Sequence, residues 1–80
     1  MTRYSNRMME LLEAEWRVAE CNALVERQRK LIEGLGYEGH DTSSAQIVFD
    51  SLVASLSLHV QSRHRLRSTL NAETSEVGAA

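Results

Sequence analysis

Few residues of this 80-residue chain are of the types that bind metals or perform redox chemistry. It has a single cysteine, Cys21, and three histidines, of which His59 falls opposite Cys21 if the chain folds into a hairpin. Two such pairs in a dimer would make a Cys2His2 zinc set. Against this, the sequence has no C-x-x-C or H-x-x-x-H spacing, and a lone cysteine commonly serves as a small buried apolar residue. We therefore predict no metal and no cofactor.

The sequence also lacks a catalytic constellation. It contains no glycine-rich phosphate loop and no nucleophile paired with a base, and its carboxylates are spaced like helix-surface glutamates. His40 next to Asp41 admits a catalytic or metal-binding role, but a motif match is only a hypothesis. We favour a role in a turn, where the His40 imidazole caps or packs next to Asp41. The chain is therefore predicted not to be an enzyme.

Two short basic clusters, at 27–30 and 63–67, offer possible contacts to phosphate or nucleic acid. Their basic residues are Arg27, Arg29, Lys30, Arg63, Arg65 and Arg67. The formal net charge is −2 and no known DNA-binding motif is present, so a helical face that pairs with glutamates explains the clusters better. A nucleic-acid- or regulator-binding accessory protein is kept as the alternative function.

The stretch 34–42, rich in glycine, is the strongest break in an otherwise helical pattern. Gly39 can adopt the left-handed conformation that ends a helix, and Asp41 can accept the free N–H groups of the next one. Gly34 and Gly36 each cost roughly 1 kcal/mol inside a helix, but Leu35 continues the apolar pattern between them. We predict a single domain over 1–80, with helices at about 5–38 and 42–70, a turn at 39–41 and a mobile tail over 71–80.

Both predicted helices carry apolar residues at alternating spacings of three and four, the pattern of a coiled-coil seam. In the first helix the seam is Leu11, Ala14, Val18, Cys21, Val25, Gln28, Ile32 and Leu35. In the second helix it is Ala45, Phe49, Leu52, Leu56, His59, Arg63, Leu66 and Leu70. Folding at Gly39 brings Gln28 level with Leu52 and Cys21 level with His59. The predicted fold is therefore all-α, a coiled-coil-like antiparallel two-helix hairpin.

A second apolar stripe of the first helix lies well over 90° from the seam at about 100° per residue. We call it the outer stripe; its residues are Met9, Leu12, Trp16, Ala19 and Ala23. One partner helix cannot cover both stripes, and a large exposed apolar patch usually marks an interface. We favour a homodimer in which two hairpins form a four-helix bundle. The alternative is that the hairpin docks on another protein.

Three segments carry a resemblance to a known group of proteins: the helix containing Val25-Glu26-Arg27-Gln28-Arg29, the turn Gly39-His40-Asp41-Thr42, and the stretch 56–60, Leu-Ser-Leu-His-Val. They resemble a group of short uncharacterised alpha-proteobacterial proteins with an "ARQR" helix and a "GHDT" turn. The resemblance covers about residues 16–70, and Cys21 departs from the pattern, as does the pair Gly34 and Gly36. It implies a small helical hairpin and no particular activity.

Length and composition complete the prediction. A chain of this size buries only about 60% of its unfolded surface, so a lone core is marginal. No apolar run approaches the roughly 20 residues of a membrane span, and one cysteine fits a reducing compartment. We predict a cytoplasmic protein without a membrane partner. Its predicted function is that of a small non-enzymatic protein-interaction or adaptor module, with a possible regulatory role.

Overall fold

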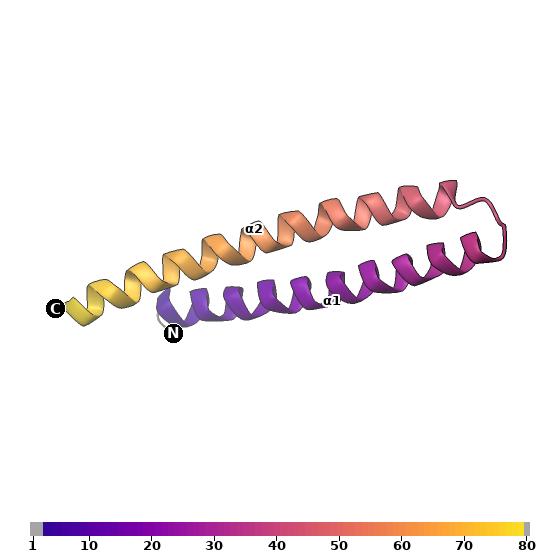
Figure 1. The fold of residues 1–80 in the computed structure, drawn as a ribbon. Coiled ribbons are helices and arrows are strands. Elements are labelled where there is room, and N and C mark those ends of the chain that lie inside the picture. The colour runs from indigo at the N-terminus through magenta and orange to yellow at the C-terminus, as the bar shows by residue number, and fades with distance from the viewer. Residues whose placement is uncertain (1–2, 80) are drawn as a thin grey trace.

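The structure is a computed structural model that describes residues 3–79, except for the side chains of residues 4 and 75–79. The described residues form two long helices, α1 (Arg3–Tyr37) and α2 (Ser43–Ala79), joined by a short turn (Figure 1). The helices run antiparallel and lie side by side, in a body 64 Å long and 17 by 14 Å across. Its radius of gyration is 18.2 Å, against about 12 Å for a compact chain of this length. The predicted all-α hairpin is confirmed, and it is a rod.

The seam between the helices is buried mainly at the open end of the hairpin. Among the described residues, the buried positions are Leu11, Ala14, Val18, Cys21 and Leu70. Towards the turn, the seam residues are only half-buried, as Val25, Ile32, Phe49 and Leu52 illustrate. Two helices can enclose only a narrow strip, because every side chain beside the seam stays in contact with water.

Two polar side chains of α1 bond across the seam to backbone carbonyls of α2. The amide Nε2 of Gln28 donates to the carbonyl of Ala45 at 2.9 Å, and the thiol of Cys21 donates to the carbonyl of Leu52 at 3.5 Å. Both acceptors lie seven positions nearer the turn than the predicted level partners, Leu52 and His59. Seven positions are about 10 Å along a helix, and a carbonyl oxygen lies no more than about 3 Å from its own Cα. The predicted pairing of Gln28 with Leu52 and of Cys21 with His59 is therefore shifted, because these side chains of α1 contact α2 nearer the turn.

The turn follows the predicted logic at Gly39, which has a φ of +81°. The N–H of His40 donates to the carbonyl of Leu35 at 2.9 Å, and the N–H of Gly39 donates to that of Gly36 at 3.1 Å. This pair of bonds is a Schellman motif, in which the residue with positive φ ends the helix and satisfies its last carbonyls. α1 therefore runs through Gly34 and Gly36, as predicted.

The predicted tail over 71–80 is wrong, because α2 continues as a helix to Ala79; residue 80 lies outside the described residues. α1 begins at Arg3, before the predicted start. The first turns of α1 therefore lie beside the C-terminal part of α2. The Nε of Arg7 lies 2.7 Å from a carboxylate oxygen of Glu73, and Leu70 is buried. Contact with α1 thus accompanies a helical stretch that the apolar periodicity of the sequence does not predict.

Two glycine substitutions test the account of the turn. A Cβ at Gly34 would meet nothing within 4 Å, and the site is helical, so Gly34→Ala should stabilise the hairpin by about 0.5–1 kcal/mol. Gly39→Ala should destabilise it by about 1–2 kcal/mol because of the positive φ. Thermal unfolding followed by circular dichroism measures both changes. Equal effects of the two substitutions would contradict the different roles assigned to these glycines.

Candidate interaction surface

The outer stripe lies on the side of α1 that faces away from α2. All five of its residues are exposed, and Trp16 exposes 67% of its surface, whereas the neighbouring seam residue Ala14 exposes 3%. The centres of the outer stripe and the seam are roughly 160° apart around the helix, from the geometry of 3.6 residues per turn. The predicted exposure is confirmed, and α2 covers none of this stripe. The role of the stripe as an interface stays a prediction.

A second surface is a hollow of about 390 Å³ on one broad side of the hairpin. It is lined by Arg17, Glu20, Cys21, Leu24, Leu52, Ser55 and His59. Cys21 and His59 therefore both line this hollow, but the α2 carbonyl that Cys21 contacts directly is that of Leu52, seven positions before His59. Within residues 3–79, no three or more histidine, cysteine, aspartate or glutamate side chains are grouped so that they could hold a metal ion.

Apolar residues extend this hollow towards the turn. Leu31 follows Leu24 by seven positions and Val48 precedes Ser55 by seven, so each lies on the same side of its helix as the hollow. The exposed fractions are 45% for Leu24, 50% for Leu31 and 48% for Val48. We call this surface the hollow face. The sequence alone assigned Leu24, Leu31 and Val48 no role; the seven-residue spacings of Leu31 from Leu24 and of Val48 from Ser55 are the signal that could have found this face.

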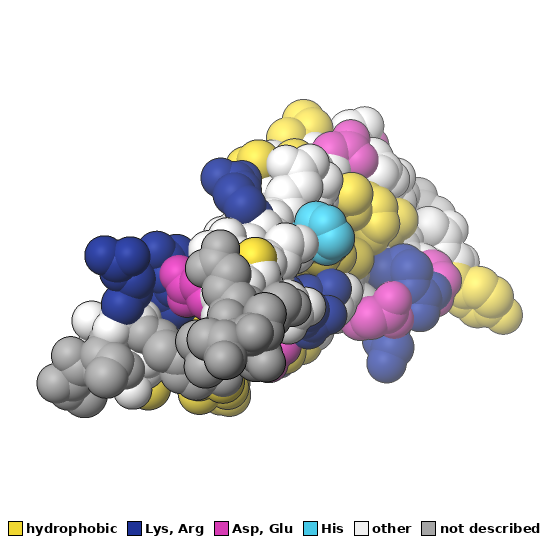
Figure 2. Space-filling view, turned by 90° about the vertical axis from the view of Figure 1, so that its left-hand side faces the viewer, with side chains coloured by type: hydrophobic (Ala, Val, Ile, Leu, Met, Phe, Trp, Pro, Cys, Tyr) yellow, Lys and Arg dark blue, Asp and Glu magenta, His cyan; other side chains and the backbone are white. Residues whose placement is uncertain are grey.

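The opposite broad side of the hairpin is charged. Arg67 of α2 donates to a carboxylate oxygen of Glu15 of α1 at 2.8 Å, which confirms one of the predicted arginine–glutamate contacts between the helices. Viewed from the open end, apolar side chains reach the surface on several sides between such charged groups (Figure 2). The two broad sides therefore differ, because one is bridged by an ion pair between the helices and the other is hollow, with Arg17 and Glu20 beside its apolar lining residues.

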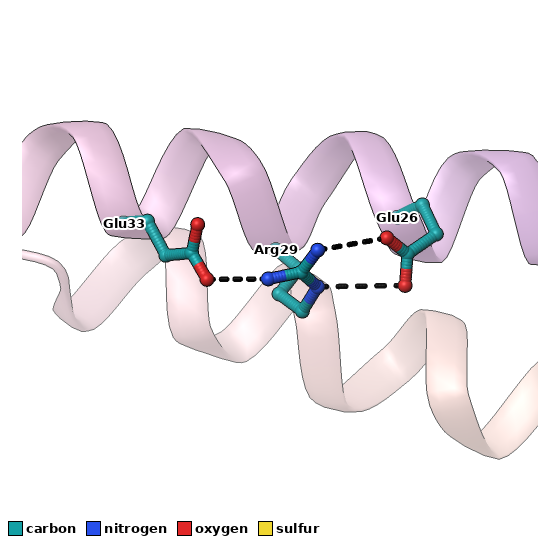
Figure 3. Close-up of polar contacts among 3 residues, drawn as sticks. All are labelled: Glu26, Arg29 and Glu33. Atoms are coloured by element: carbon teal, nitrogen blue, oxygen red, sulfur yellow. Dashed lines mark hydrogen bonds and ion pairs between the residues drawn. The ribbon is translucent and has the colours of Figure 1, made fainter.

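In each of the two basic clusters, one arginine is engaged by acidic side chains. Arg29 lies between two acidic side chains of its own helix, donating to Glu26 at 2.9 Å and also to Glu33 (Figure 3). The hydrogen bond from Arg29 lowers the pKa of Glu26, and the same bond raises the pKa of Arg29. In the other cluster, Arg67 is engaged by Glu15. Half-buried Arg63 has a shielded Nε without a hydrogen-bond partner in the described part of the chain.

Asp41 caps α2 as predicted, but His40 behaves differently from the prediction. One carboxylate oxygen of Asp41 accepts the Ser43 backbone N–H at 2.9 Å and the Ser43 hydroxyl at 2.7 Å. These bonds, the hydroxyl first, lower the pKa of Asp41. The exposed imidazole of His40 lies 3.3 Å from the Glu38 carboxylate instead of packing beside Asp41. The part of His40 that caps a helix is its backbone N–H.

This geometry defines a class of structure, an all-helical two-helix hairpin with exposed apolar surface. Comparisons with protein-family models, with curated proteins and with solved structures find no match to the chain. The resemblance of the 27–29 and 39–42 segments to short alpha-proteobacterial proteins therefore stays a prediction. Neither helix, over residues 3–79, has a stretch long and apolar enough to cross a membrane.

The Asp41 cap predicts a pH dependence of stability. Because the Asp41 pKa is lowered in the folded state, its contribution is present above the ordinary aspartate pKa of about 3.9 and is lost as pH falls through the lower folded value. Asp41→Asn should remove that part of the acid sensitivity. Thermal unfolding of both proteins between pH 2 and pH 6 tests this, and parallel pH profiles would contradict it.

The engaged arginines of the basic clusters predict weak binding to nucleic acid. Arg29 and Arg67, two of the six basic residues, already pair with glutamates, and the formal net charge of −2 opposes association with DNA. Fluorescence anisotropy with mixed-sequence duplex DNA should detect no binding in micromolar protein at physiological salt. Tight binding that weakens steeply with salt, and that Arg27→Gln and Lys30→Gln reduce, would instead support the nucleic-acid alternative.

Proposed function

We propose that this hairpin is a non-enzymatic protein-interaction module that pairs with a second copy to form a four-helix bundle. The amount of exposed surface carries this proposal. The chain exposes 6057 Å², whereas a compact monomer of 9.0 kDa exposes roughly 4,900 Å² by the usual size scaling. The excess of roughly 1,200 Å² is more than the roughly 800 Å² that each partner buries in a standard interface.

The chemical character of the exposed surface supports a role in protein interaction. Trp16 and Leu58 are 67% and 66% exposed, and eight other large apolar side chains of the described residues are also exposed. Aromatic residues are enriched at protein interfaces, where a buried tryptophan often provides a large share of the binding energy. A hairpin that carries such residues on more than one side can pair with a second copy through one side and bind another protein through a different side.

Light scattering behind size exclusion, across a wide concentration range, tests the proposal. We expect a mass near twice the chain mass of 9.0 kDa at high concentration, with dissociation on dilution. The apparent melting temperature should rise with protein concentration, because association stabilises the folded chain by mass action. A mass of one chain at millimolar concentration, with a melting temperature independent of concentration, would contradict self-pairing.

A further inference from the structure

We propose that the second copy binds on the hollow face, crossing antiparallel at Leu24 of α1 and Leu52 of α2, and that the outer stripe stays outside the resulting bundle. This inference rests on the proposed self-pairing and specifies its surface. Three features of the structure support it: where the seam is incomplete, which side of each helix a bundle can use, and how the charges are arranged.

The seam is incomplete at the level of the hollow face. Leu52, which lines the hollow, is half-buried, and so is Gln28 nearer the turn, whereas Ala14 and Val18 of α1 nearer the open end are buried. On α2, every seam residue except Leu70 is half-buried. A second hairpin placed on the hollow face covers these half-buried residues together with Leu24, Leu31 and Val48. The apolar surface removed from water is therefore continuous with the existing core, which is the arrangement of a four-helix bundle.

The two candidate surfaces differ in their angle from the seam around the axis of α1. In a compact four-helix bundle, each helix contacts two neighbours whose directions differ by roughly 90° around its axis. Leu24 and Leu31 lie roughly 70–80° from the local seam centre at 100° per residue, as a bundle requires. The outer stripe, centred on Trp16, lies roughly 160° away and cannot join the same core.

The charges around Leu24 would attract those of a second, antiparallel copy of the chain. Glu20 and Arg27 flank Leu24 by four and three positions and lie on the same side of α1, since they are seven residues apart. An antiparallel copy that crosses at Leu24 thus places Glu20 of one chain beside Arg27 of the other, twice by symmetry. Both residues are exposed, and neither forms an ion pair within residues 3–79, so both are available.

The helix α2 shows the same self-complementarity in size. Val48 and Ser55 flank Leu52 by four and three positions, so the antiparallel copy sets the larger Val48 of one chain against the small Ser55 of the other. Leu24 and Leu52 line the same hollow, so one crossing point serves both helices. Side chains of unequal size in opposite positions allow the helices to pack closely.

The outer stripe lacks this electrostatic match. An antiparallel copy centred on Trp16 brings Glu13 of one chain beside Glu20 of the other, because these residues flank Trp16 by three and four positions on one side of α1. Like charges in facing positions oppose association. Glu13 also lies 3.9 Å from Arg17 of its own helix, which offsets part of this repulsion. The rim of the hollow face brings opposite charges together, whereas the rim of the outer stripe provides no such attraction.

Matched glutamate substitutions on α1 test the assignment. Leu24→Glu should raise the dissociation constant of the dimer at least about a hundredfold, because it puts unpaired charges at the crossing point. Trp16→Glu, at a more exposed position of the same helix, should change it less than about threefold. Sedimentation equilibrium measures both constants, and far-ultraviolet circular dichroism at the same concentrations reports helix content. The assignment would be overturned if Trp16→Glu weakened the dimer as much as Leu24→Glu, or if Trp16→Glu weakened it and Leu24→Glu did not.

A charge exchange tests the register with changes that are confined to exposed side chains. Glu20→Arg and Arg27→Glu should each weaken dimerisation roughly tenfold, and the double variant should restore it to within about threefold. A double variant no tighter than the single variants would overturn the crossing at Leu24. If the unmodified chain is a monomer at every concentration, self-pairing itself fails, whereas a dimer with the wrong response to these variants overturns only the hollow face.

Discussion

Two helices share one seam, and this geometric constraint governs the rest of the structure. Each helix can turn only one side towards its neighbour, so even the best-covered residues keep some contact with water: Ala14, in the middle of the buried group, still exposes 3% of its surface. Association with another chain is the physical remedy open to such a thin structure, since more buried apolar area is what a small chain lacks. The exposed apolar surfaces are thus a direct consequence of the fold.

Much of the fold was predictable because its strongest signals are local. The alternation of three and four residues identifies the seam, and one glycine followed by an aspartate identifies the turn, since few residues tolerate a positive φ or cap a helix well. Gly39 and Asp41 take these roles in the structure. The exposure of the outer stripe followed from helical geometry alone, because Trp16 lies far around α1 from the seam.

The differences from prediction come from contacts between residues distant in sequence. The stretch 71–79 lacks an apolar pattern, yet it is helical, and Glu73 within it contacts Arg7 near the start of α1. One difference is local: the His40 imidazole has a carboxylate on either side in the sequence, which does not determine whether the ring faces Glu38 or Asp41. The hollow face depends on which positions of two helices lie at one level, and that requires the packed register.

The two apolar surfaces have different consequences for stability. Residues of the hollow face continue the half-buried seam, so covering them would strengthen the contact between α1 and α2 near the turn. Covering the outer stripe would protect Trp16 but would leave that contact unchanged, because the stripe does not touch α2. A second copy on the hollow face therefore couples dimerisation to the folding of each hairpin through mass action. In the proposed arrangement, a protein bound to the outer stripe would join a dimer already assembled, so affinity for that protein could change without altering the stability of the bundle. This separation suits an adaptor, whose partner surface can vary while its own assembly is kept.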